Sequence, residues 1–172
     1  MTIGLEHLAI TDHHSLAAHG PVARALGRAA AAGQPVPTLW RGAEISALLE
    51  GCLVHVLALG FGDEHAALLP YLQGQAVVGE ALQAAAVCRA IHAAGGLALL
   101  AHPARYRLPF QRLISAAAEL GFDGAETWYD YDQQQRWVPT PLVCEAIARQ
   151  LSSHGLLMSC GTDTHGHHLH GR

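Results

Sequence analysis

Gly95-Gly96-Leu97-Ala98-Leu99-Leu100-Ala101-His102-Pro103 is the segment from which the architecture of this chain can be inferred most directly. Two glycines, which commonly end helices, precede an apolar run of strand length. A histidine followed by proline ends that run. The segment predicts a helix, a buried strand and then a polar residue at the strand's C-terminal end, where parallel α/β folds place their active sites.

Five further apolar runs of strand length lie on either side of this segment, and helical segments separate most of them. The predicted strands are Leu8–Thr11, Thr38–Ile45, Cys52–Leu59, Leu97–Ala101, Gly124–Trp128 and Leu156–Cys160. The predicted helices, each followed by glycine, are Leu16–Ala32, Ala76–Ala94, Phe110–Leu120 and Pro141–His154. Alternation of strands and helices predicts an α/β fold with a parallel sheet.

The composition narrows the class of protein. The 172 residues suffice for one domain with a core, and 51% are hydrophobic while 14% are charged, which is a globular balance. The net charge of -4 and the lack of long basic blocks argue against stable binding of duplex nucleic acid. The four cysteines form no CxxC pair and no apolar stretch reaches 18 residues, so we expect a reduced, cytoplasmic setting without a membrane span.

Histidines and carboxylates gather at the predicted strand ends. The chain has 13 histidines, more than its ten lysines and arginines together. A cluster of imidazole and carboxylate groups suits Zn²⁺, Mn²⁺ or Fe ions, and paired ions can acidify a bound water and neutralise a phosphoryl oxygen. The strand-end candidates are Asp12, His13, His14, Glu44, His55, His102, Glu126, Asp163 and His165.

Each candidate also has a structural interpretation that the sequence leaves open. Asp12 and His13 can cap the following helix, and Glu44 can pair with Arg41. His55 can be a hydrogen-bonded core residue, and Asp163 can form an Asx-turn. Glu126 can be a salt-bridge partner at the rim, and the last three histidines can form a solvated tail.

Five motifs in order resemble the PHP (polymerase and histidinol phosphatase) family, in its small metal-dependent phosphoesterase branch, across nearly the whole chain. They are Ile10-Thr11-Asp12-His13, Gly42-Ala43-Glu44-Ile45-Ser46, His55-Val56-Leu57, Ala101-His102-Pro103-Ala104-Arg105 and Gly161-Thr162-Asp163-Thr164-His165-Gly166. The resemblance implies a distorted (β/α)7 barrel, similar to a TIM barrel, that holds two or three divalent metal ions (Zn, Mn or Fe).

The resemblance also implies roles for individual residues. Glu44 would bridge two ions, His55 and His102 would complete one site with it, and Asp163 would bind the first ion. His13 and His165 would serve a third ion. Asp12, His13 and Asp163 are the predicted catalytic residues. Arg105, whose guanidinium offers a fork of donors, and His14 are the predicted substrate-binding residues.

The implied reaction is hydrolysis of a phosphomonoester or phosphodiester, such as a nucleotide or a short oligonucleotide, by metal-bound hydroxide. The family's first strand carries a His-x-His pair followed by Ser-Asp-Gly, and nothing before Thr11 supplies them. We therefore expect residues 1–172 to form a single PHP-like domain that lacks the first strand and helix. A fragment or degenerate metal- or nucleotide-binding module without activity is one alternative, and a C–N bond metallohydrolase of the amidohydrolase type is another.

Overall fold

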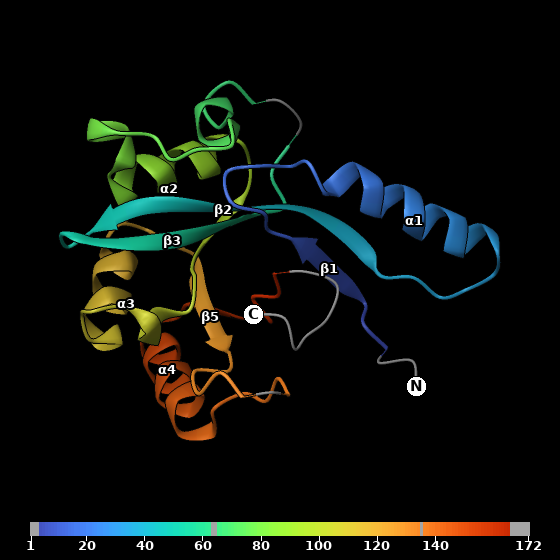
Figure 1. The fold of residues 1–172 in the computed structure, drawn as a ribbon. Coiled ribbons are helices and arrows are strands. Elements are labelled where there is room, and N and C mark those ends of the chain that lie inside the picture. Colours follow the sequence, from blue (N-terminus) through green and yellow to red (C-terminus); the bar gives the residue numbers. More distant parts are fainter. Residues whose placement is uncertain (1–3, 63–64, 135, 166–172) are drawn as a thin grey trace. The chain divides into compact units, whose positions relative to one another are not determined.

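The structure, a computed structural model, describes residues 4–62, 65–134 and 136–165 (Figure 1). The chain divides into two compact units. The first consists of Met1–Ala47 and Val56–Ala98, and the second consists of Leu48–His55 and Leu99–Arg172.

Six strands and four α-helices form the described part of the chain. The strands are β1 (His7–Ile10), β2 (Thr38–Leu49), β3 (Cys52–Leu59), β4 (Leu97–Leu100), β5 (Gly124–Trp128) and β6 (Leu157–Cys160). The α-helices are α1 (His19–Ala31), α2 (Ala84–Ala93), α3 (Phe110–Glu119) and α4 (Pro141–His154). Three short 3-10 helices are η1 (Leu69–Leu72), η2 (Gly79–Leu82) and η3 (Pro103–Arg105).

Hydrogen bonds join the strands in chain order, from β1 to β6. In the first unit β1 and β2 are parallel, with Ile10 opposite Arg41. In the second unit β5 is parallel to β4 and to β6, and the register between β5 and β6 shifts between Glu126 and Trp128. Parallel neighbours end at the same edge of a sheet, so within each unit the residues that follow these strands emerge together.

The connection between β2 and β3, where the sequence predicts no helix, is a tight turn. β2 continues four residues beyond the predicted end and meets β3 through Glu50 and Gly51 alone. Both connecting residues have positive φ, 52° and 69°, which is the signature of a tight hairpin turn. A two-residue connection joins antiparallel strands, so the fold is mixed α/β and the expectation of a wholly parallel sheet is wrong here.

Helix α2 of the first unit buries Val87, Cys88 and Ile91, which lie on one face at helical spacing. The prediction of a helix over Ala76–Ala94 is wrong at its start, because α2 begins only at Ala84. Gly79 has φ +67°, outside the right-handed helical region, so one continuous helix cannot pass through it.

Helix α1 begins at His19, three residues after the predicted start, and none of its residues is buried. The residues before it form turns, and the Ala18 N–H that precedes the helix donates to the Asp12 carboxylate.

The second unit packs α3 and α4 against each other and α4 against β5 (Figure 1). Helix α3 buries Leu113, Ile114 and Ala117, and α4 buries Ile147 and Leu151 with Cys144. Burial of each large apolar side chain contributes about 1.5–3 kcal/mol. The bounds predicted for β3, β5 and α4 are confirmed, and those for β1, β4, β6 and α3 differ by one residue at one or both ends. No helix in residues 4–62, 65–134 and 136–165 has the length and hydropathy that crossing a bilayer requires.

Candidate metal centre

The loop after β1 places His13 opposite Glu44 on β2. The Glu44 N–H donates to the Asp12 carbonyl at 3.0 Å, and the His14 N–H donates to the Glu44 carbonyl at 2.9 Å. His13 and Glu44 thereby form an isolated parallel bridge that continues the pairing of β1 with β2. A side chain at Gly42 would meet the Ile10 carbonyl at 2.7 Å, so glycine permits the close approach of the two strands.

His13 and Glu44 differ in their exposure to solvent. His13 Nε2 lies 3.9 Å from Glu44 Oε2, and the two side chains are 45% and 8% exposed. A buried carboxylate is unfavourable without a positive partner, such as a protonated imidazole or a cation. The pair therefore presents a carboxylate anchored in the protein and an imidazole accessible from solvent.

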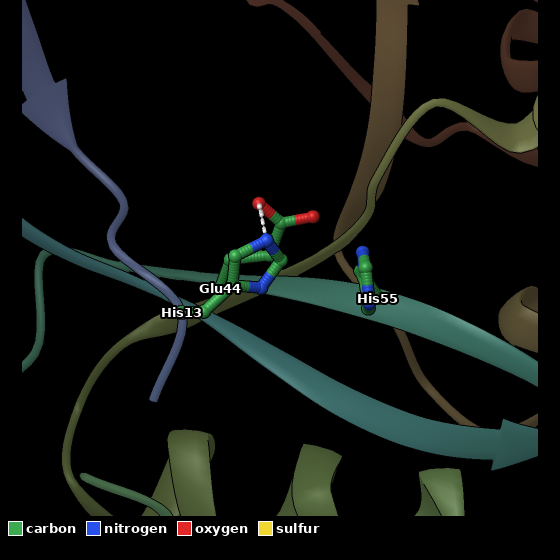
Figure 2. A group of neighbouring side chains, drawn as sticks. All are labelled: His13, Glu44 and His55. Carbon is green, nitrogen blue, oxygen red and sulfur yellow. Dashed lines mark ion pairs between the residues drawn. The ribbon is translucent and has the colours of Figure 1, made fainter. Parts of the chain in front are cut away.

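His55 of β3 adds a third donor. One ligand atom from each of His13, Glu44 and His55 lies within 4.8 Å of the other two. Figure 2 shows the imidazole of His13 turned toward the Glu44 carboxylate, with His55 beside them on β3. Two nitrogens and a carboxylate are the donor set that Zn²⁺ accepts, and Mn²⁺ and Fe²⁺ accept it as well. The three residues fit a divalent cation.

The neighbours of His13 have structural contacts. The Ala18 N–H donates to Asp12 Oδ2 at 3.2 Å, so the Asp12 carboxylate stabilises the entry to α1. His14 is buried, and its Nε2 lies 3.0 Å from Ser46 Oγ and accepts from the Ser46 N–H at 3.3 Å. Its Nδ1, 3.3 Å from the Tyr71 carbonyl, is then the protonated nitrogen. The structure therefore places both ring nitrogens of His14 against protein groups.

In the second unit, His102 adopts a conformation that is rare for a residue other than glycine. Its φ is 26° and its ψ is 61°, and the following Pro103 disfavours helical angles further. Its N–H donates to Glu126 Oε2 at 2.8 Å, and both side chains are buried. The ring of His102 lies 5.6 Å from that of His55 between centroids. The strained turn at the end of β4 thus directs the His102 imidazole toward His55.

Arg105, Tyr129 and Asp163 form a closed triangle of hydrogen bonds. Arg105 Nη1 donates to Asp163 Oδ2 at 2.6 Å and to Tyr129 Oη at 2.8 Å. The Tyr129 hydroxyl donates to the same Asp163 oxygen at 2.7 Å. His165 Nδ1 lies 3.7 Å from Asp163 Oδ1, the oxygen outside this triangle. The structure therefore brings Arg105, Asp163 and His165 together with Tyr129.

The environment of these groups shifts two pKa values upward. Burial raises the pKa of the Tyr129 hydroxyl, and the hydrogen bond to Asp163 raises it further. Burial lowers the pKa of Arg105, but attraction to Tyr129 and Asp163 outweighs it and leaves that pKa raised. Tyr129 is therefore a neutral donor, and Arg105 is a permanent cation.

Glu126 and Tyr129, which contact the predicted site residues of the second unit, have no role assigned from the sequence. The sequence allows Glu126 to be a salt-bridge partner at the rim, whereas in the structure it is buried and accepts the His102 N–H. Tyr129 lies just past β5, where the register shift alters the alternation of side chains. No periodicity could have shown that its hydroxyl reaches Asp163, which is 34 residues away.

No protein-family model matches the chain, and no curated protein matches it either. Solved structures do resemble it. One is an amidohydrolase from Chromobacterium violaceum, crystallised with sulfate and without metal, at TM-score 0.67 and 21% identity over 92% of this chain and 77% of that one. Another is an inferred metal-dependent phosphoesterase from Bifidobacterium adolescentis, at TM-score 0.68 and 20% identity over 95% of this chain and 79% of that one. At such identities the likeness establishes a shared fold, and the chain is thus similar in fold to one protein named as an amidohydrolase and to another named as a metal-dependent phosphoesterase.

Proposed function

We propose that this protein is a metal-dependent hydrolase that cleaves a phosphomonoester or phosphodiester. The observation that carries the proposal is the group of His13, Glu44 and His55, whose ligand atoms lie within 4.8 Å of one another. The likeness in fold to the phosphoesterase from Bifidobacterium adolescentis supports the same class of reaction.

Different side chains of the protein would bind the metal and the substrate phosphate. When bound, divalent ions supply a water that ionises near neutral pH and positive charge for the phosphoryl oxygens. Glu44 provides buried negative charge to retain a cation, and His13 and His55 provide neutral nitrogens. Arg105 is 38% exposed and permanently charged, which suits a group that binds a substrate phosphate.

The proposal extends to the type of barrel, the metal ions, the substrate and the roles of individual residues. We propose a distorted (β/α)7 PHP-type barrel with two or three Zn, Mn or Fe ions, acting in the cytoplasm on a nucleotide or short oligonucleotide. The proposed metal ligands are His13, Glu44, His55, His102, Asp163 and His165. Asp12 would act in catalysis through its hold on the loop that carries His13, since its carboxylate is engaged by Ala18. His14 would likewise act on substrate through that loop.

Metal content and phosphoesterase activity test the proposal together. The purified chain is incubated with Mn²⁺ or Zn²⁺, desalted, and measured by elemental analysis and with a chromogenic phosphodiester and phosphomonoester. We expect bound metal and turnover in the natural sequence. Glu44→Gln should lose both, because it removes the buried charge, while Glu119→Gln, which alters an exposed carboxylate on α3, should retain both. Metal-free protein after incubation, or equal behaviour of the two variants, would contradict the proposed site.

The amidohydrolase neighbour favours a second candidate, hydrolysis of a C–N bond. Such barrels use similar sets of histidine and carboxylate ligands. Turnover of amide or lactam substrates, with none of either phosphoester, would support it. Metal binding without turnover of any of these substrates would support a non-catalytic binding module.

A further inference from the structure

Tyr129 occupies the centre of the second unit's polar cluster. Its side chain is 1% exposed, and its hydroxyl contacts Arg105 Nη1 at 2.8 Å and Asp163 Oδ2 at 2.7 Å. Its ring lies 5.6 Å from that of His102, and the Arg105 guanidinium lies 5.8 Å from the centre of the same ring. One aromatic side chain therefore touches three residues to which the sequence assigned metal or substrate binding.

The backbone of Tyr129 is also fixed. Its carbonyl accepts from the Thr140 N–H at 3.1 Å and from Cys144 Sγ at 3.4 Å, at the first turn of α4. The ring packs at 4.9 Å from that of Tyr131. A side chain held by its backbone and by ring contacts on several sides has little freedom, so its hydroxyl marks a defined point in space.

Arg105, by contrast, is a long side chain that is 38% exposed. A lone ion pair with Asp163 would leave its guanidinium free to rotate about the carboxylate. The second acceptor, Tyr129 Oη, fixes the plane of the fork. The hydroxyl also donates to Asp163 Oδ2, which leaves Oδ1 on the side of His165.

We propose that Tyr129 is a positioning residue that orients the Arg105 guanidinium for a substrate phosphate. This inference rests on the proposed function for the identity of the substrate group. It deepens that proposal, because it assigns the recognition of phosphate to an arginine held in place by a buried tyrosine.

The test is a double-mutant cycle on phosphate binding, which does not depend on turnover. Isothermal titration measures the Kd of inorganic phosphate at one fixed Mn²⁺ concentration for the natural sequence, Tyr129→Phe, Arg105→Ala and the double variant. Loss of a charge-assisted hydrogen bond predicts about a tenfold or larger weakening in Tyr129→Phe. In the Arg105→Ala background, the same change should cost less than about twofold, because the hydroxyl acts through Arg105.

Tyr131→Phe is the matched control, since it removes one hydroxyl from the neighbouring buried ring and should change Kd by less than about twofold. Arg105→Lys probes the same geometry if Tyr129→Phe does not fold. A lysine cannot reproduce the planar fork, so phosphate affinity should again fall about tenfold or more. With a chromogenic phosphoester, Tyr129→Phe should raise KM by a similar factor and change kcat by less than about threefold.

The outcomes separate this inference from the proposed function. Non-additive loss of phosphate affinity without any phosphoesterase turnover would support Tyr129 as a positioning residue and reject the reaction. Turnover together with additive effects, or with normal phosphate affinity in Tyr129→Phe or Arg105→Lys, would overturn the role of Tyr129 and leave the reaction standing. Failure of the natural sequence to bind phosphate at all would also overturn it.

Discussion

The backbone N–H of His102 donates to Glu126 Oε2 at 2.8 Å, which ties the strained turn after β4 to the centre of β5. His102 has φ 26°, a value that a histidine adopts only when its surroundings hold it there. Glu126 supplies that hold, because a charged acceptor on a buried N–H is stronger than a neutral one. Asp163 also has positive φ, 48°, so backbone strain marks two of the predicted metal ligands.

Replacement of Glu126 should test this tie. Glu126→Ala leaves the His102 N–H without its acceptor in a buried place and should lower the free energy of unfolding by about 1–3 kcal/mol. Glu126→Gln keeps a carbonyl oxygen in the same position and should lose less. Urea denaturation followed by circular dichroism measures the free energy of unfolding of both variants. Equal stability of the two variants would show that the hydrogen bond from His102 does not stabilise the fold.

Gly161 makes room for the same carboxylate. A Cβ at this position would overlap Glu126 Oε1, and Glu126 cannot move away without losing His102. We expect Gly161→Ala to destabilise the protein by about 1–3 kcal/mol.

The matched control for Gly161→Ala is Gly27→Ala inside α1, where nothing lies within 4 Å. That change should stabilise by up to about 1 kcal/mol, since alanine favours helix. Thermal melting compares the two variants. An unchanged melting temperature in Gly161→Ala would mean that the Glu126 side chain can adopt another conformation that avoids the added methyl group.

Metal binding should stabilise the folded chain. Ions that bind the native state but not the unfolded chain raise the melting temperature, and a metal concentration a hundredfold above Kd adds about 2.7 kcal/mol. We expect Mn²⁺ or Zn²⁺ to raise the melting temperature of the natural sequence and of Glu119→Gln. Glu44→Gln, which loses the buried carboxylate beside His13, should show no such rise. A rise of the same size in Glu44→Gln would place the bound ion elsewhere.

The turn between β2 and β3 should respond to residues that tolerate positive φ. Glu50 has φ 52°, where asparagine is better accommodated than glutamate, so Glu50→Asn should stabilise by a few tenths of a kcal/mol up to about 1 kcal/mol. Loss of the exposed ion pair between Glu50 and Arg112, at 2.5 Å, offsets little of that gain.

Gly51→Ala places a side chain at φ 69° and should destabilise the hairpin by about 1–2 kcal/mol. Chemical denaturation distinguishes it from Glu50→Asn. The interpretation of this turn fails if the two substitutions shift stability in the same direction.

Stability should fall in alkaline solution because of Tyr131. Burial raises the pKa of its hydroxyl, with the Glu126 charge adding to the effect. Above the ordinary tyrosine pKa of 10.0 the unfolded chain loses this proton while the folded chain keeps it, so the stabilisation present below pH 10.0 is lost as pH rises. The urea midpoint, measured from pH 8 to pH 11, should fall less steeply in Tyr131→Phe. Parallel profiles for the two proteins would contradict the raised pKa.

Local sequence patterns predict a strand or helix correctly where its hydrophobic residues form a continuous run or recur at helical spacing. The apolar run Cys52–Leu59 and the helix Pro141–His154 have the predicted bounds. Prediction fails where backbone conformation, and not hydrophobicity, decides the structure. Gly79 interrupts an otherwise helical segment, and Glu50 with Gly51 turns the chain back through two residues of positive φ, which hydrophobic periodicity does not reveal.

The sequence by itself determined the alternation of elements and the identity of the imidazole and carboxylate groups, because hydrophobic periodicity and residue chemistry are local properties. Only the tertiary structure decided which of these groups meet. The Glu126 contact with His102 spans 24 residues and that of Tyr129 with Asp163 spans 34, and the strand register and the turn after β4 fix both. The cost of closing such long loops is met by the packing of the whole unit, so no short stretch of sequence specifies these contacts.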